Sequence, residues 1–162
     1  MPYALLALVL VILDQVVKYL VLTHIPLGGY VPLLPHVVCL TYVQNTGAAF
    51  SMFSQHTWIL AFISLVMSAV LAVALWKNFF THPLGKVTLS LLLAGAVGNL
   101  IDRALRGFVV DMFQLLFMNF AVFNVADICV VVGGIAAAAY YLLLADKLEH
   151  KEAPHGTADT DR

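Results

Sequence analysis

Residues 57–76 read TWILAFISLVMSAVLAVALW and carry no charged side chain. A hydrocarbon core about 30 Å thick needs roughly 20 helical residues for one crossing, which is the length of this stretch. Trp58 and Trp76 are 18 positions apart, so a helix would separate them by about 27 Å and place one indole at each membrane interface. Lys77 then ends the apolar run. The stretch therefore predicts a membrane-spanning helix.

The composition of the whole chain agrees with this stretch. Of the 162 residues, 62% are hydrophobic and only 10% are charged, and no Asp, Glu, Lys or Arg occurs from Tyr19 to Trp76. The mean hydropathy is +0.97. A water-soluble globular protein needs far more surface charge than this. The net charge is -1 with the eight Lys and Arg scattered, so we expect no nucleic-acid partner and look for partners among membrane lipids and membrane-bound substrates.

Four segments have the length and hydropathy of membrane spans, at about 3–22, 57–76, 87–106 and 125–144. The first has no Lys or Arg ahead of it and no small-residue cleavage pattern after it, which predicts a retained span rather than a signal peptide. We therefore predict an all-α integral membrane protein with four transmembrane helices. Residues 1–145 would form a single membrane-embedded domain, and the polar residues 146–162 a disordered cytoplasmic tail.

Two connections favour strands instead of helices. Residues 23–56 are rich in Pro and Gly, and the β-branched and aromatic run Val37–Val43 is followed by Gln-Asn-Thr-Gly at 44–47. This pattern predicts turn, strand and turn. Residues 107–123 are apolar, but they are only 17 long and are interrupted by Asp111, Gln114 and Asn119. We predict strand and loop there, and a small sheet lying on the membrane surface.

Basic residues in the connections predict the orientation. With four spans, five charges share one side, namely Lys77, Lys86, Lys147, Lys151 and Arg162, whereas the other side carries Arg103 and Arg106. The positive-inside rule then places both termini in the cytoplasm. Asn45, Asp111 and Asp127 would face outward.

Asp111 and Asp127 are the strongest candidates for chemistry, because carboxylates at or near hydrocarbon are costly. Fifteen residues separate them and can fold back to bring the two acids together. Such a pair shares a proton, and it can activate water while hydrogen-bonding a carbonyl oxygen, which is amide hydrolysis by an aspartyl dyad. The alternatives are that Asp127 caps a helix with Asn124 and that Asp111 is a solvated loop acid. Capping and catalysis are compatible.

The other polar residues in the apolar segments have two interpretations each. Asp14 and Lys18 are one helical turn apart, so they could form a structural ion pair or take part in catalysis. Asn99, Asp102 and Arg103 lie at i, i+3 and i+4, where Arg103 could reach lipid phosphate or position loops and substrate. Asn45 before Thr-Gly could form a turn or hydrogen-bond an extended substrate.

Other functions are less well supported by the residues. The six His show no metal-ligand spacing, so we expect no metal and no zinc protease. Ser51 or Ser54 could pair with Lys18, but nothing nearby marks a nucleophile. A small transporter would need polar groups at both faces, whereas 66–75 and 130–144 are almost wholly apolar. A structural subunit would have no use for paired acids.

Five motifs in order resemble one known family, the bacterial lipoprotein signal peptidases, also called signal peptidase II. The motifs are Asp14-Gln15-x-x-Lys18, Asn45-x-Gly47-x-Ala49-Phe50, Gly98-Asn99-x-x-Asp102-Arg103, Val109-Val110-Asp111 and Phe123-Asn124-x-Ala126-Asp127. They run from the first span to the fourth and leave out only the tail. Two positions depart from the pattern of many members, where Phe would stand at Met112 and a Pro near Ala121-Val122, which bears on the shape of the connecting loop.

The resemblance implies a four-helix aspartic endopeptidase of the bacterial inner membrane, with a small extracytoplasmic β-sheet cradle. Its substrates would be lipidated prolipoproteins, cleaved immediately before the cysteine that carries a diacylglyceryl group. Asp111 and Asp127 would be catalytic, and substrate would be held by Asn45, Gly47, Asn99, Arg103 and Asn124. Asp14, Lys18 and Asp102 would support the fold. The resemblance implies no cofactor, and it implies globomycin-type cyclic peptides as inhibitors. We expect a monomer.

Overall fold

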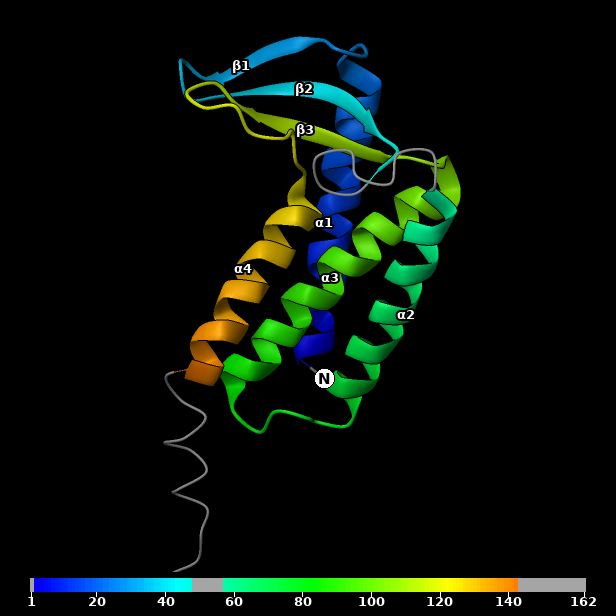
Figure 1. Cartoon of the computed structure of the whole chain (residues 1–162), viewed down its shortest axis with the longest axis vertical. Coiled ribbons are helices and arrows are strands. Elements are labelled where there is room, and N and C mark those ends of the chain that lie inside the picture. Colours follow the sequence, from blue (N-terminus) through cyan, green and yellow to red (C-terminus); the bar gives the residue numbers. More distant parts are fainter. Residues whose placement is uncertain (1, 48–56, 143–162) are drawn as a thin grey trace, which may run out of the picture.

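The computed structural model of the chain describes residues 2–47 and 57–142. These residues form four α-helices and three β-strands, in the order α1 (Pro2–His24), β1 (Tyr30–Leu34), β2 (Val38–Asn45), α2 (Thr57–Trp76), α3 (Pro83–Arg106), β3 (Val109–Leu115) and α4 (Val125–Tyr140). The helices form a bundle and the sheet covers one end of it (Figure 1). The N-terminus and the α2–α3 connection lie at the opposite end. The predicted tail, 146–162, lies outside the described residues.

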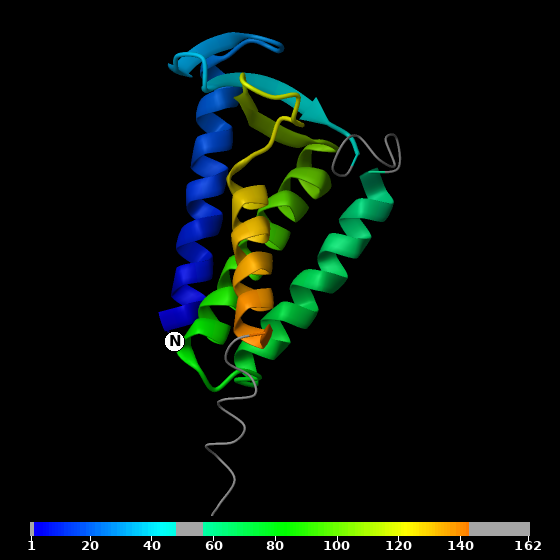
Figure 2. The same ribbon diagram turned by 60° about the vertical axis from the view of Figure 1, so that its left-hand side comes forward.

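Three of the described helices are long and apolar enough to cross a membrane, and α4 is a shorter apolar helix of 16 residues. Their outward side chains are large and apolar, for example Phe62 at 63% and Ile135 at 65% exposure. In water such a surface would be unfavourable, whereas in lipid it needs no partner. The turned view shows the helices running between the sheet and the opposite end of the bundle (Figure 2).

Helix α3 packs against each of the other helices, and glycine allows its close approach to α4. A Cβ built on Gly95 would lie 2.5 Å from the backbone oxygen of Ala126. Small residues at such a crossing let two backbones approach closely. As a result, the polar residues in the second half of α3 lie next to the start of α4.

The start of α3 corrects the predicted span. The helix begins at Pro83, four residues before the expected 87. Proline is favourable at the first helical position because the N–H that it lacks would have no partner there. His82 caps the helix by accepting a hydrogen bond from the backbone N–H of Leu84 at 3.2 Å. Lys86 therefore lies inside the helix and not at its boundary. At the other end Gly107 takes a left-handed conformation with φ 79° and ends the helix.

The sheet is antiparallel with strand order β1-β2-β3. Strand β3 confirms the strand predicted within 107–123, and β2 confirms the strand predicted at Val37–Val43 but runs on to Asn45, where we predicted a turn. Strand β1 is a correction, since Pro and Gly in 23–35 predicted turns. Pro32 is accommodated because β1 is an edge strand, where a missing N–H can face away from the sheet. The register shifts between Pro32 and Leu34.

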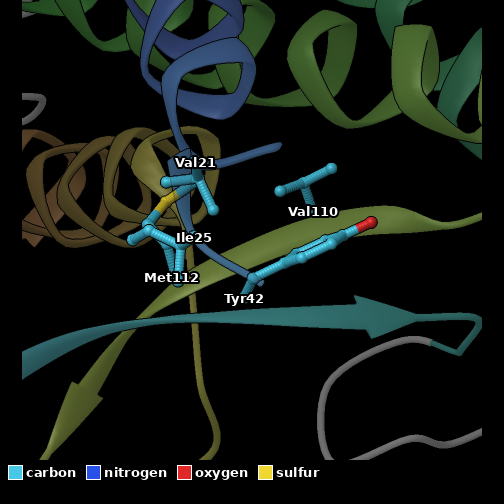
Figure 3. Close-up of a cluster of buried hydrophobic side chains, with 5 residues drawn as sticks. All are labelled: Val21, Ile25, Tyr42, Val110 and Met112. Atoms are coloured by element: carbon cyan, nitrogen blue, oxygen red, sulfur yellow. The ribbon is translucent and has the colours of Figure 1, made fainter. Parts of the chain in front are cut away.

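A small apolar core joins the sheet to the end of α1. It consists of Val21, Ile25, Tyr42, Val110 and Met112 (Figure 3). Val110 and Met112 are completely buried. Since successive side chains of a strand point to opposite faces, anchoring these two residues against α1 turns the residue between them, Asp111, to the other face of β3.

Candidate active site

Asp111 and Asp127 are joined through one side chain, that of Asn124. The amide nitrogen of Asn124 donates to Asp111 Oδ1 at 2.7 Å. Its amide oxygen accepts from the backbone N–H of Asp127 at 2.9 Å, and the backbone N–H of Asn124 donates to Asp127 Oδ2 at 3.1 Å. This is the capping box that the sequence suggested, and it fixes the Asp127 carboxylate at the N-terminus of α4. The capping interpretation is confirmed, and the capping residue also holds the second acid.

Two further amides complete the contacts of the acids. Asn45, at the end of β2, donates to Asp111 Oδ2 at 2.9 Å. Its own oxygen accepts from the backbone N–H of Gly47 at 2.9 Å. Asn99 of α3 donates to Asp127 Oδ1 at 2.8 Å. Each carboxylate oxygen therefore accepts one N–H and keeps further capacity for a proton or a water molecule.

A cavity of about 450 Å³ opens beside these acids. Its polar lining consists of Asn45, Asn99, Arg103, Asp111 and Asp127. The rest of the lining is apolar and comes from β3, from the segment before α4 and from one side of α4, namely Val109, Leu115, Phe120, Ala121, Val122, Phe123, Ile128, Val130, Val131 and Val132. The cavity thus joins a small polar end to a large apolar wall, which suits an amphipathic ligand.

The surroundings of Asp111 make its carboxyl easier to protonate than an ordinary one. Only 2% of Asp111 is exposed, and burial, together with the nearby Asp127 carboxylate, raises its pKa to about 6, against the opposing hydrogen bonds from Asn45 and Asn124. In the described part of the chain no ion pair reaches Asp111 or Asp127. A proton can therefore reside on this pair close to neutral pH.

Arg103 lines the same cavity, and its side chain contacts α2 and Gly47. Its guanidinium donates to the backbone oxygen of Gly47 and to Ser64 Oγ of α2, both at 3.4 Å. The buried Arg103 Nε has no hydrogen-bond partner among the described residues. Arg103 therefore lines the polar end of the cavity while its guanidinium bonds the backbone of Gly47.

A second polar cluster lies next to the first, and its members Asp14, Lys18 and Asp102 are buried. Lys18 Nζ lies 2.9 Å from Asp14 Oδ2 and 3.0 Å from Asp102 Oδ2, which confirms the ion pair predicted for Asp14 and Lys18. Asp14 Oδ1 accepts from the backbone N–H of Ala126 at 2.8 Å, and Asp102 Oδ2 accepts from that of Val110 at 3.0 Å. The two accepting carboxylates therefore tie α1 and α3 to the residues directly before Asp127 and Asp111.

Two members of this second cluster were not selected from the sequence. Gln15 donates to Asp14, to the backbone oxygen of Gly98 and to Asp102 at 3.1 to 3.3 Å. Arg106 forms an ion pair with Asp102 and is 25% exposed at its side chain. The spacing of Asp102 and Arg106, one helical turn apart, was an available signal for this pair. Within 2–47 and 57–142 no three His, Cys, Asp or Glu side chains cluster as metal ligands would.

Comparisons with known proteins agree with this geometry. Residues 6–143 match the protein family described as Signal peptidase (SPase) II. A lipoprotein signal peptidase of Enterococcus faecalis is 43% identical over 155 residues, covering 96% of this chain and 95% of that protein. One from Streptococcus pneumoniae is 46% identical over 136 residues, covering 80% and 85%. The chain belongs to the signal peptidase II family.

Solved structures support the same assignment. A bacterial membrane enzyme determined by the in meso method at 2.3 Å resolution superposes with a TM-score of 0.83 at 31% identity, covering 99% of this chain and 94% of that one. Another, at 1.9 Å, gives 0.79 at 33% identity, covering 89% and 94%. The protein is therefore an aspartic-type bacterial membrane peptidase that cleaves the signal peptides of prolipoproteins, as the five motifs predicted.

Proposed function

We propose that Asp111 and Asp127 are the catalytic dyad, and that the scissile bond is the one immediately before a diacylglyceryl-modified cysteine. The observation that carries this proposal is the Asn124 side chain, which bonds Asp111 directly and caps the helix that holds Asp127. Both acids line the same cavity. Two acids that share an open cavity, with neither in an ion pair among the described residues, fit a catalytic role better than a structural one.

The two environments suggest different roles for the two acids. Asp127 accepts two N–H bonds at a helix N-terminus, where the helix dipole favours the charged form. Asp111 is buried, and its raised pKa of about 6 lets it carry a proton near neutrality in a far larger fraction of molecules than an ordinary carboxyl does. In this assignment Asp127 takes a proton from water while the water oxygen attacks the carbonyl carbon. Asp111 gives its proton to the carbonyl oxygen. The tetrahedral intermediate then breaks its C–N bond: Asp127 gives the proton that it took from water to the leaving nitrogen, and Asp111 takes back a proton from one hydroxyl of the intermediate as the carboxylic acid forms.

We propose that the remaining polar residues of the cavity hold the peptide. Arg103 and Asn45 would bind backbone carbonyl groups of the extended substrate, and Gly47 lets the chain pass close to them. Asn99 and Asn124 would keep the two acids in place. The apolar wall, including Ile128, would bind apolar side chains and acyl groups. The mixed lining of the cavity supports this division, because the substrate carries both an amide and a lipid.

The proposed topology has both termini in the cytoplasm and the dyad on the outer side of the inner membrane. It is supported by the position of the N-terminus and the α2–α3 connection at the end of the bundle opposite the sheet and by the positive-inside rule. We further propose a single peptidase domain at 1–145 with a cytoplasmic tail, action as a monomer, and inhibition by globomycin-type cyclic peptides that occupy the same cavity.

Separate substitutions Asp111→Asn and Asp127→Asn test the dyad. Because each removes one partner of the proton transfer, we expect kcat to fall by about 10³-fold or more with the protein still folded. The measurement is cleavage of a synthetic precursor peptide with a diacylglyceryl cysteine in detergent micelles, with thermal unfolding as the folding control. Turnover within tenfold of the unmodified enzyme in either variant rejects the dyad.

A further inference from the structure

Lys18 has an arrangement that its ion pairs alone do not explain. Its side chain is completely buried. The ammonium lies 2.9 Å from Asp14 Oδ2, 3.0 Å from Asp102 Oδ2 and 3.0 Å from Asn99 Oδ1. An ammonium has three protons and no acceptor. All three protons are therefore in use, and one of them goes to a neutral amide that also contacts Asp127.

This contact determines which way the Asn99 amide points. Because Lys18 can only donate, the Asn99 atom facing it must be the oxygen. The amide nitrogen of Asn99 then faces Asp127 Oδ1 at 2.8 Å. The second donor to the Asn99 oxygen is the Asn124 amide, at 3.2 Å. Of the two donors, the ammonium is charged and closer, so it makes the stronger bond.

We propose that Lys18 is a positioning residue for peptide hydrolysis: it holds the Asn99 amide so that its N–H points at Asp127. The proposal rests on the proposed function, in which Asp127 is the acid that activates water. Lys18 itself does not line the cavity and touches no substrate in this scheme. Its effect on the reaction passes through Asn99, separately from its ion pairs with Asp14 and Asp102.

The structure separates these two effects of Lys18. Asp14 contacts Lys18, Gln15 and the backbone of Ala126, but none of these bonds reaches Asn99. The substitution Asp14→Asn therefore removes the charge of one carboxylate without removing any group that contacts Asn99. Its one amide oxygen can accept either from Lys18 or from the backbone N–H of Ala126, because these donors face different oxygens of Asp14. Lys18→Met alone would leave two buried carboxylates with fewer counter-charges. Asp14→Asn removes one of these two negative charges first.

The test is a double-substitution cycle in the Asp14→Asn background. The variants add Lys18→Met, Asn99→Leu, or both, and kcat and KM are measured on the diacylglyceryl-cysteine peptide in micelles. We expect Asp14→Asn alone to stay within about threefold of the unmodified kcat. Adding Lys18→Met should lower kcat by about 10- to 100-fold with KM changed less than about threefold. Once Asn99→Leu is present, Lys18→Met should cost less than a further twofold.

Two results would overturn the positioning role. One is an unchanged kcat after Lys18→Met in the Asp14→Asn background. The other is a multiplicative loss in the combined variant, which would mean that Lys18 and Asn99 act independently. If the Lys18→Met variants do not fold, the same cycle is run with Lys18→Gln, which also removes the charge. The positioning role is then supported if Lys18→Gln no longer lowers kcat once Asn99→Leu is present. It is overturned if Lys18→Gln lowers kcat by the same factor with and without Asn99→Leu.

The same assays keep this inference apart from the dyad. If Asp111→Asn and Asp127→Asn abolish turnover but the Lys18 cycle is multiplicative, the dyad stands and the positioning role fails. If either Asp→Asn variant turns over normally, the dyad fails, and the positioning role, which needs Asp127 as the base, fails with it.

Discussion

The molecule holds two acidic clusters side by side, and they differ in how their charge is balanced. In the closed cluster, Asp14 and Asp102 face Lys18, and Asp102 also faces Arg106. In the open cluster, the donors to Asp111 and Asp127 among the described residues are amide N–H groups, from Asn45, Asn99, Asn124 and the backbone. The closed cluster is not part of the cavity lining, whereas both acids of the open cluster line it.

This difference shows what decides the role of a buried carboxylate. An acid that contacts a cation and N–H donors and lies outside the cavity is not reached by a ligand there, so it serves as a link between elements. An acid that is held by neutral donors next to a cavity loses hydration without gaining a counter-charge. Its pKa is therefore raised, as that of Asp111 is. The closed cluster therefore holds the backbone, and the open cluster is free to exchange protons.

The largest expected effect on stability comes from removing the Asp102 carboxylate from the closed cluster. Asp102→Leu should lower the free energy of unfolding by about 3–5 kcal/mol, because it removes one of the three acceptors of the Lys18 ammonium, the ion-pair partner of Arg106 and the acceptor of the Val110 N–H. Asp102→Asn is the matched control, since it keeps an oxygen for Val110 and should cost less. Denaturant unfolding in micelles measures both. Equal stability of the two variants and the unmodified protein would mean that the closed cluster does not hold the fold.

In the open cluster, the contribution of Asp111 to stability should change with pH. The folded pKa of Asp111, about 6, is above its ordinary value of 3.8. The folded state therefore binds more protons than the unfolded state between these values. The contribution of Asp111 to stability is therefore fully present below about pH 3.8 and is lost as pH rises through about 6. The total change is at most about 3 kcal/mol. Asp111→Asn should remove this dependence.

Unfolding of the unmodified protein and of Asp111→Asn in micelles, compared at pH 4, 5, 6 and 7, measures the effect. The difference between the two proteins isolates Asp111 from the other titrating groups. We expect the stability of Asp111→Asn relative to the unmodified protein to rise with pH across this window. A difference that stays constant from pH 4 to 7 would contradict the raised pKa and the assignment of Asp111 as the proton donor.

Adding a methyl group at Gly98, beside the closed cluster, should have a smaller effect on stability. A Cβ added to Gly98 would lie 2.7 Å from Asp14 Oδ2 and 3.1 Å from the Cβ of Ala126. Gly98→Ala should therefore destabilise the protein by about 1–3 kcal/mol. Gly134 in α4 is the matched control, because a Cβ there meets nothing within 4 Å, and Gly134→Ala should leave stability unchanged or raise it slightly. Thermal unfolding compares the two, and equal shifts would argue against close packing at Gly98.

The sequence predicted most of what depends on local pattern. Hydropathy indicated the four helices, and β-branched and aromatic runs indicated strands β2 and β3. The spacing of Asn124 and Asp127 predicted the capping box, and that of Asp14 and Lys18 their ion pair. In each case the partners are neighbours along one element, so the pattern within a single segment contains the contact.

The contacts that define the site depend on packing and were beyond the reach of such patterns. Asp14 accepts from the backbone of Ala126, 112 positions away in the chain, and a backbone N–H leaves no signal in the sequence. Strand β1 was missed because Pro32 indicates a turn unless the strand is known to be an edge. Arg106 is the exception: it was counted only for orientation, although its spacing from Asp102 within one helix indicated the ion pair.

The smallest effect on stability is expected from substitutions of Asn124, whose capping of α4 can be separated from its contact with Asp111. Asn124 caps α4 and also donates to Asp111 at 2.7 Å. Asn124→Ala should cost about 1 kcal/mol of stability by removing the cap, whereas Asn124→Ser keeps a capping oxygen and should cost much less. Neither variant has an amide that reaches Asp111, so we expect both to lower kcat by at least about tenfold. Thermal unfolding and peptide cleavage in micelles measure the two effects. If Asn124→Ser restored both stability and turnover, the cap alone would matter, and the amide that joins the two acids would have no part in the reaction.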